Sequence, residues 1–210
     1  DRRMEISERA KCLGVKFYQF YRQMEKLIAA ADVVISMGGG STIDAVKAAI
    51  VLDVLGGEIE DWFGVGKVSA ALEESGRKLT PHVAIQTAAS SAAHLTKYSN
   101  ITDPVIGQKK LIVDEAIVPP KCIFDYAVTE SQPLALTQDG ALDGIAHVLE
   151  VYYGAPPEVE AEAREVCEVA LDLIIPGVTA VMKDPGDREA RMKLGLGTDL
   201  GGYAIMIGGT

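Results

Sequence analysis

Apolar residues in the first part of the chain alternate between helical and extended patterns. Residues 7–31 have apolar side chains at helical spacing, and the short β-rich run 32–37 is typical of a strand buried on both faces. Glycines follow this run, and residues 43–55 return to a helical pattern that ends at Gly56-Gly57. Strand, glycine turn and helix in this order predict one unit of a parallel α/β sheet.

Short extended segments continue through the middle of the chain. Residues 82–87 and 122–126 are predicted strands, the second placed after the breaker Pro119-Pro120. Residues 98–102 and 111–113 are predicted to form a strand pair around a turn at 103–107, which contains proline and glycine. These segments extend the predicted α/β sheet to about residue 132.

Beyond Pro133 the pattern is helical only. Residues 137–153 and 157–183 are predicted helices, the second with a break at Pro176. Asp184 is predicted to cap a last helix, with Pro185 in its first position. We therefore expect an α/β domain over residues 1–132 and an all-helical domain over residues 133–210.

Composition and charge narrow the classes of function. The net charge of the 210 residues is -10, which disfavours a nucleic-acid partner, because an acidic surface repels phosphate backbones. No apolar run reaches the roughly 18–20 residues that a membrane span needs, and no apolar core of a signal peptide follows the first five residues. Three widely spaced cysteines suit a reduced, cytoplasmic protein better than a disulfide framework.

The run Gly38-Gly39-Gly40-Ser41 lies between a predicted strand and a predicted helix. Glycines let the backbone approach a ligand closely, and the helix N-terminus directs free N–H groups at it, so a pyrophosphate is the expected guest. The spacing differs from the G-x-G-x-x-G and P-loop patterns. A tight glycine turn that binds nothing is the alternative.

Asp44 and Lys47 are three residues apart and share one face of the helix that follows the glycines. Two interpretations stay open for this pair. It forms a surface salt bridge, or it lies near the phosphates or the nicotinamide of a cofactor.

Asp143 and His147 are four residues apart in a largely apolar helix, which stacks their side chains roughly 6 Å apart along the axis. A carboxylate oxygen and an imidazole nitrogen in this arrangement can share one divalent metal. A helical Asp-His pair without a metal is the alternative, and two ligands cannot complete a metal site.

A run of small residues follows the predicted strand 82–87, and its Thr87, Ser90 and Ser91 offer hydroxyl groups to a cofactor. The alternative for this run is a capped helix start. His94 is a catalytic acid or, as we favour, a capping or surface residue. We interpret His82, which opens the strand beside Pro81, as structural.

Taken in order, these motifs resemble the iron-containing alcohol dehydrogenase family. The Gly-Gly-Gly-Ser-x-x-Asp-x-x-Lys signature of that family is matched by Gly38 to Lys47, and its Asp-x-x-x-His-x-x-Glu signature by Asp143, His147 and Glu150. The segment from Asp125 to Pro133 is similar to the stretch that leads into the helical domain of the family. The likeness covers nearly all of the chain and is much more specific than either motif alone.

The resemblance implies a dehydroquinate synthase-like architecture, in which a Rossmann-like nucleotide-binding domain precedes an all-α domain and the active site lies between them. It implies NAD(P) on the glycine turn, and Asp143 and His147 as the first two ligands of a divalent metal, iron(II) or in some members zinc(II). The metal would polarise an alcohol or aldehyde oxygen while hydride passes to or from the nicotinamide. A homodimer is compatible with this architecture.

Three departures from the family pattern matter. No histidine follows His147, so the two further histidine ligands of the family are expected beyond Thr210, and the opening strands before Asp1. We therefore expect a fragment. The family segment Thr-Thr-Ala-Gly-Thr-Gly-Ser-Glu appears as residues 87–94 without its glycines and its glutamate.

Two other functions remain open. One is a dehydroquinate synthase-like, glycerol-1-phosphate dehydrogenase-like or glycerol dehydrogenase-like relative. The other is a degenerate member that only binds nucleotide. The sequence specifies neither the substrate nor the choice between NAD and NADP.

Overall fold

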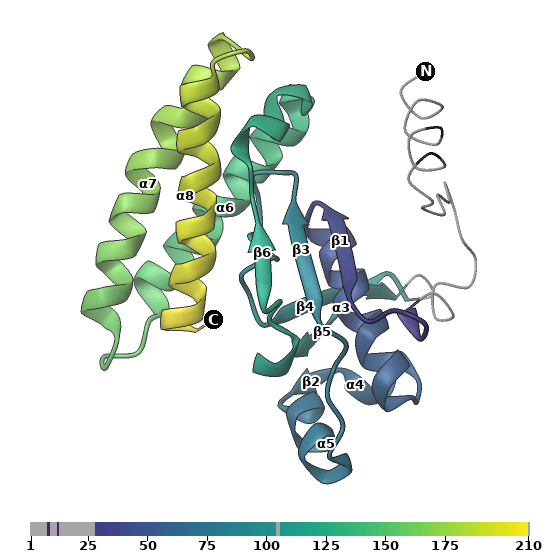
Figure 1. Cartoon of the computed structure of the whole chain (residues 1–210). Coiled ribbons are helices and arrows are strands. Elements are labelled where there is room, and N and C mark those ends of the chain that lie inside the picture. The colour runs from purple at the N-terminus through teal and green to yellow at the C-terminus, as the bar shows by residue number, and fades with distance from the viewer. Residues whose placement is uncertain (1–7, 9–11, 13–27, 104–105, 210) are drawn as a thin grey trace.

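The computed structural model describes residues 8, 12, 28–103 and 106–209 of the chain (Figure 1). The predicted helix over residues 7–31 falls almost entirely outside these ranges. The element labels below follow Figure 1.

A parallel sheet, here called the main sheet, organises the α/β part. It has the strand order β1-β3-β6, with β1 at Val34–Gly38, β3 at His82–Gln86 and β6 at Lys121–Ile123. Helix α3, Gly40–Leu55, follows β1 directly. The predicted unit of strand, glycine turn and helix is therefore confirmed, and so is the predicted strand that begins at His82.

The prediction that the first strand is buried on both faces is wrong for the described part of the chain. Ser36 is buried and its hydroxyl lies 2.7 Å from His82 Nε2, which confirms the structural interpretation of His82. Ile35 and Met37, on the other face of β1, are each 64% exposed. A continuous apolar run therefore does not by itself establish that a covering layer packs on both faces of a strand.

Strand β6 is shorter than predicted. It ends at Ile123, and the chain turns into a 3₁₀ helix, η2, at Tyr126–Ser131. The Asp125 side chain accepts a hydrogen bond from the Ala127 N–H and so caps η2. This local side-chain-to-backbone bond competes with continued strand pairing.

A second three-stranded sheet lies beside α3. It has the order β2-β5-β4, with β2 at Gly64–Val65, β4 at Tyr98–Asp103 and β5 at Gln108–Val113. Strands β4 and β5 pair antiparallel from Tyr98 opposite Val113 to Asp103 opposite Gln108, so the predicted strand pair is confirmed. Short helices α4, Ile59–Trp62, and α5, Lys67–Ser75, and the 3₁₀ helix η1, Glu115–Ile117, surround this sheet.

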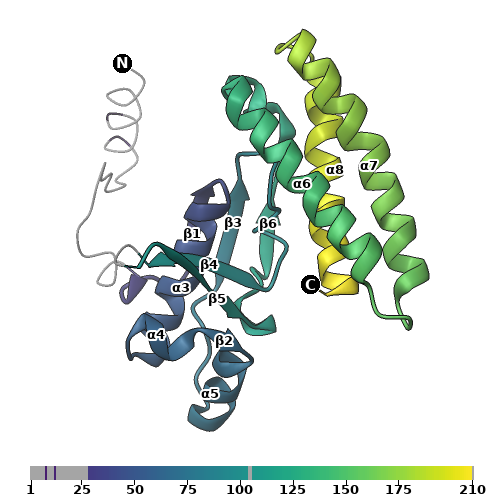
Figure 2. The same cartoon turned by 180° about the vertical axis from the view of Figure 1, so that it is seen from behind.

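The remaining helices form a bundle on the β6 side of the main sheet (Figures 1 and 2). They are α6 at Leu134–Gly154, α7 at Glu160–Lys183 and α8 at Arg188–Gly208. Their shared core includes Val148, Cys167, Ile174, Leu194 and Ala204. Among the described residues, none of the helices is long and apolar enough to cross a membrane. The division of the chain into two domains at residue 132 stays a prediction.

Two predictions about helix ends are wrong. Helix α7 continues through Pro176, although proline lacks the N–H that a helix interior requires and costs about 3 kcal/mol there. Close packing explains its continuity, because a Cβ on the neighbouring Gly177 would lie only 3.1 Å from the Leu194 backbone nitrogen of α8. Helix α8 begins at Arg188 and is capped by Asp187, whereas Asp184 ends α7 and accepts from the Gly186 N–H.

Candidate functional site

Most of the predicted site residues line one cleft of about 860 Å³. It lies between the carboxyl ends of β1 and β3 and the face of α6 that carries the Asp-His pair. In open α/β sheets the carboxyl ends of parallel strands are where ligands bind. The predicted residues in its lining are Gly39, Gly40, Ser41, Asp44, Thr87, Ser90, Ser91, Asp143 and His147.

The glycine turn presents free backbone donors to this cleft. Gly39 is the N-cap of α3, and its carbonyl accepts from the N–H groups of Thr42, at 3.0 Å, and Ile43, at 3.2 Å. The N–H groups of Gly40 and Ser41 are left without a backbone acceptor in the described part of the chain. Together with the positive end of the helix dipole, these donors form a site for an anion such as a pyrophosphate.

The three glycines have different surroundings. A Cβ on Gly38 would lie 2.5 Å from Thr42 Oγ1, and a Cβ on Gly40 would lie 2.5 Å from Ser91 Oγ. Gly38 is therefore required by the packing of the turn, because the Thr42 Cβ is also in the way, whereas at Gly40 the Ser91 hydroxyl would have to move. A Cβ on Gly39 would meet only Ala88 Cβ, at an ordinary distance of 3.6 Å. Gly39 leaves open space that belongs to the cleft.

Asp44 and Lys47 are buried, so the surface salt bridge is excluded. They are 6% and 2% exposed, and their charged groups, Asp44 Oδ1 and Lys47 Nζ, lie 3.8 Å apart. Lys47 donates hydrogen bonds to the carbonyl oxygens of Ala93, Thr96 and Tyr98 at 2.6–2.7 Å. Burial lowers the pKa of Lys47 to about 8, although Asp44 opposes the shift.

This arrangement changes the expected role of Lys47. All three ammonium protons are used on backbone carbonyls, and Lys47 does not line the cleft. Direct contact with a cofactor is therefore not its role in this geometry. It holds the loop between β3 and β4 against α3 instead.

Asp44 does reach the cleft. Its Oδ2 accepts from the Asn100 N–H at 3.1 Å, and its buried Oδ1 has no hydrogen-bond partner within the described residues. Burial raises the pKa of Asp44, and the charge of Lys47 opposes that shift. The Lys47 ammonium, 3.8 Å from Oδ1, offsets part of the cost of burying this carboxylate.

The predicted hydroxyl-rich run does not start a helix, so that alternative is wrong. Residues 87–97 form bends and turns, and Ala92 has the left-handed φ of +47°. This conformation favours glycine, which the resembled family segment has at this position. Gly202 of α8 faces Ala92 closely enough that a Cβ there would collide with the Ala92 methyl group. A glycine in α8 therefore provides the space that Ala92 occupies.

His94 is neither a surface residue nor a residue of the cleft. It is 2% exposed, and its Nε2 lies 3.4 Å from Asp199 Oδ1 of α8. Its ring meets Phe124 edge-on at a centroid distance of 5.7 Å, and the Tyr126 hydroxyl donates to Asp199 Oδ2 at 3.1 Å. The surface interpretation of His94 is therefore wrong. Nothing in the sequence pattern singled out Asp199 or Tyr126 as its neighbours.

Asp143 and His147 face the cleft from α6, opposite the glycine turn. Their side chains are 47% and 32% exposed, and Asp143 Oδ1 lies 3.8 Å from His147 Nε2. An oxygen and a nitrogen donor suit iron(II) or zinc(II), which fits the metal that the resemblance implies. No group of three or more His, Cys, Asp or Glu side chains that could hold a metal occurs among the described residues. The pair therefore supplies part of a coordination shell.

Sequence reasoning missed some residues of the cleft. Lys109 of β5 lines it and adds a positive charge on the side of the second sheet, next to Asn100 and Thr102. The strand pair was predicted, but its position beside α3 depends on tertiary contacts such as the 2.8 Å hydrogen bond from Ser99 Oγ to the Asp44 carbonyl. No local pattern indicates such contacts.

The position of α6 depends on Gly140, and this leads to a prediction. A Cβ on Gly140 would collide with the Ala89 carbonyl oxygen, which belongs to the loop that lines the cleft. We expect Gly140→Ala to lower the free energy of unfolding by about 2 kcal/mol or more, because backbone on both sides must shift. Chemical denaturation measures this loss. Gly154→Ala, on the same helix with nothing within 4 Å of the added Cβ, is the matched control. Equal stability of the two variants would contradict the packing described here.

The sequence of the chain is similar to those of known proteins. The family model described as "Iron-containing alcohol dehydrogenase" matches residues 18–126. Alcohol dehydrogenase 4 of Saccharomyces cerevisiae is 31% identical over 176 residues, which cover 83% of this chain and 44% of that protein. The NAD-dependent methanol dehydrogenase of Bacillus methanolicus is 31% identical over 180 residues, which cover 85% of this chain and 44% of that protein.

Solved structures of named dehydrogenases and reductases have a similar fold. The NADH-dependent butanol dehydrogenase A of Thermotoga maritima superposes with a TM-score of 0.75 at 25% identity, over 89% of this chain and 45% of that one. A sulfoacetaldehyde reductase from Bifidobacterium kashiwanohense, solved in complex with NAD+, has a TM-score of 0.77 at 22% identity, over 99% of this chain and 57% of that one. The chain spans about half the length of the curated relatives named above.

Proposed function

Because the chain belongs to the iron-containing alcohol dehydrogenase family, we propose that its cleft binds NAD(P) next to a divalent metal. In a protein of the relatives' length, this cleft would transfer a hydride between a small alcohol or aldehyde and the nicotinamide. The observation that carries the proposal is that one cleft is lined both by the glycine turn and by the Asp143–His147 pair.

The nucleotide would be held mainly by the start of α3. The free N–H groups of Gly40 and Ser41 would receive the pyrophosphate, assisted by the positive charge of Lys109. Hydroxyl groups of Thr87, Ser90 and Ser91 line the same space. A helix N-terminus outweighs the chain's net negative charge locally, since its donors are fixed and directed at the ligand.

Asp44 would orient the nicotinamide end of the cofactor. Asp44 lines the cleft, its Oδ1 makes no hydrogen bond within the described residues, and a carboxamide N–H₂ group is a donor that NAD(P) offers. The charge of Lys47, 3.8 Å away, would favour the ionised form of Asp44, and Lys47 would not touch the cofactor. It is a positioning residue in this proposal.

Asp143 and His147 would supply an oxygen and a nitrogen ligand to iron(II), with zinc(II) as the alternative ion. A bound metal supplies Lewis-acid chemistry, which polarises a substrate alcohol or carbonyl oxygen. The role of the two side chains is to hold that ion on α6, across the cleft from the glycine turn, where substrate oxygen and nicotinamide can meet.

Among the functions left open by the sequence, the relatives favour the dehydrogenase. They carry the names of alcohol, methanol and butanol dehydrogenases and of a sulfoacetaldehyde reductase, not of a synthase. We propose a reducing, cytoplasmic environment. The cysteines Cys12, Cys122 and Cys167 are all free, which supports it.

The proposed reaction is tested with a protein of the relatives' length that contains this chain. We expect NAD(P)H to form when primary alcohols from methanol to butanol are added, measured by its absorbance. Removal of the metal by a chelator should lower the rate by about 100-fold or more, and iron(II) should restore it. No alcohol-dependent reduction in the metal-loaded protein, with nucleotide binding intact, would favour the degenerate member instead.

A further inference from the structure

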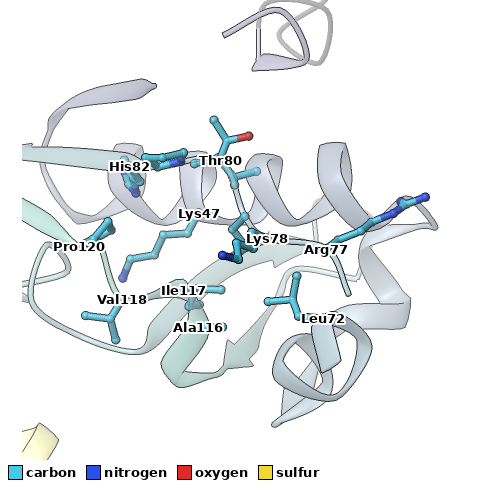
Figure 3. Close-up of a pocket in the computed structure, with 13 residues that line it drawn as sticks. Lys47, Leu72, Arg77, Lys78, Thr80, His82, Ala116, Ile117, Val118 and Pro120 are labelled. Atoms are coloured by element: carbon cyan, nitrogen blue, oxygen red, sulfur yellow. The ribbon is translucent and has the colours of Figure 1, made fainter. Parts of the chain in front are cut away.

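A second cavity, of about 300 Å³, lies at the opposite end of the main sheet from the cleft (Figure 3). Thr80, Pro81 and His82 border it where β3 begins, and Pro120 borders it just before β6. The cleft, in contrast, lies where β1 and β3 end. The cavity is thus a separate site, and none of the proposed cofactor or metal chemistry uses it.

The walls of this cavity are mainly apolar. They come from α3, α5, η1 and the connections around them, and the apolar side chains include those of Ile50, Leu72, Leu79, Ala116, Ile117 and Val118. An apolar cavity of about 150 Å³ is known to hold benzene, which has six non-hydrogen atoms, so a cavity of about 300 Å³ can hold roughly a dozen. The size and the lining favour a small ligand with a hydrocarbon part.

The charged residues of the lining are all basic. Lys47, Arg77 and Lys78 border the cavity, and its lining contains no Asp or Glu. The acidic residues next in sequence to it are engaged: Glu115 pairs with Lys97 at 3.0 Å, and Asp114 accepts from the Ser69 N–H at 2.8 Å. Burial lowers the pKa of His82 to about 4, so His82 is neutral at pH 7. The potential in the cavity therefore favours an anion.

One of the three cations is available to bind it. The ammonium protons of Lys47 go to three backbone carbonyls, and Arg77 Nη1 donates to the Val54 carbonyl at 2.6 Å. Lys78 makes no hydrogen bond or ion pair within the described part of the chain. Figure 3 shows the Lys78 side chain directed toward the middle of the cavity, whereas that of Arg77 extends away from it. A single free ammonium suits a monoanion, since a phosphate group is usually held by several donors.

We propose that this cavity binds a short-chain aliphatic monocarboxylate, with its hydrocarbon chain against Leu72 and Ile117 and its carboxylate on Lys78. The bound chain would also pack against α3, the helix that begins at the glycine turn. The site adds a second ligand to the molecule and does not depend on the proposed dehydrogenase function.

Hexanoate, which has eight non-hydrogen atoms, is the probe, and binding to the chain is measured by isothermal titration calorimetry. We expect saturable binding at one site and an affinity at least about tenfold lower for 1-hexanol, which has the same chain without the charge. Lys78→Gln should weaken hexanoate binding about tenfold or more. Lys183→Gln, which removes one charge from an exposed residue at the end of α7, is the matched control and should bind as the unchanged chain does.

A second variant tests whether hexanoate occupies the volume of this cavity. Ala116→Phe places a ring in the lining and should abolish hexanoate binding in a chain whose circular dichroism is unchanged. If that variant does not fold, the two lysine variants decide the question alone. The proposal is overturned if Lys78→Gln and Lys183→Gln bind hexanoate equally. It is also overturned if hexanol binds as well as hexanoate, if inorganic phosphate binds at the same site more tightly, or if hexanoate shows no saturable binding.

Discussion

Replacing Gly39 with valine is expected to weaken NAD(P)H binding by about 100-fold or more while the chain stays folded. Gly39 is the N-cap of α3 and has an ordinary extended backbone, with φ of −80° and ψ of −174°, so a side chain causes no backbone strain. An added Cβ meets only Ala88 Cβ at 3.6 Å. The valine methyl groups would therefore fill the space of the cleft in which a pyrophosphate must approach the N–H groups of Gly40 and Ser41.

Fluorescence titration with NADH and NADPH measures the loss, and circular dichroism shows whether the variant is folded. Gly39→Ala should have an intermediate affinity, because its single methyl group occupies less of the cleft. Gly38 and Gly40 are unsuitable for this test, since a Cβ on either would lie 2.5 Å from a neighbouring hydroxyl oxygen, and the side chain of Thr42 or Ser91 would have to move. Unchanged affinity in a folded Gly39→Val chain would remove the glycine turn from the nucleotide site.

His147→Ala is expected to remove most of the metal, and with it the hydride transfer, from a protein of the relatives' length that contains this chain. Loss of one of two adjacent donors leaves the Asp143 carboxylate as the remaining ligand on α6, so metal content should fall below about a tenth of the unchanged level. Turnover with alcohol should drop by about 1,000-fold. NAD(P)H affinity should change by less than about threefold, because the glycine turn lies across the cleft.

Elemental analysis and alcohol-dependent NAD(P) reduction, made on the same preparations, test this pair of effects. Gln138→Ala, an exposed change on the same helix that lies outside the cleft, is the control and should keep metal and turnover. The 210 residues alone should bind metal weakly, since their described part offers only two adjacent ligands. Stoichiometric metal and normal turnover in His147→Ala would make Asp143 and His147 an ordinary helical pair.

The sequence was sufficient to predict features that depend on the backbone preferences of neighbouring residues. Period and glycine position predicted the strand before Gly38 and the helix after it, and spacing alone placed Asp143 and His147 on one face of α6. The strand pair on either side of Gly107 also follows from local turn chemistry. These features depend on backbone preferences of a few neighbouring residues.

The sequence pattern could not predict features that depend on tertiary contacts. Spacing put Lys47 on the same face as Asp44, but only the fold shows that its ammonium is buried against the carbonyl of Thr96 and its neighbours. His94 meets Asp199, a residue more than a hundred positions away on α8. Pro176 remains inside α7 because packing against α8 outweighs its intrinsic preference to end a helix.

The central claim is that the glycine turn and the Asp143–His147 pair belong to one cofactor cleft. A crystal structure of the chain in complex with NAD+ would test this claim most directly. We expect the pyrophosphate within hydrogen-bonding distance of the Gly40 and Ser41 backbone nitrogens, and the nicotinamide between Asp44 and His147. A nucleotide bound elsewhere, or one whose nicotinamide points out of the cleft and away from α6, would contradict the account.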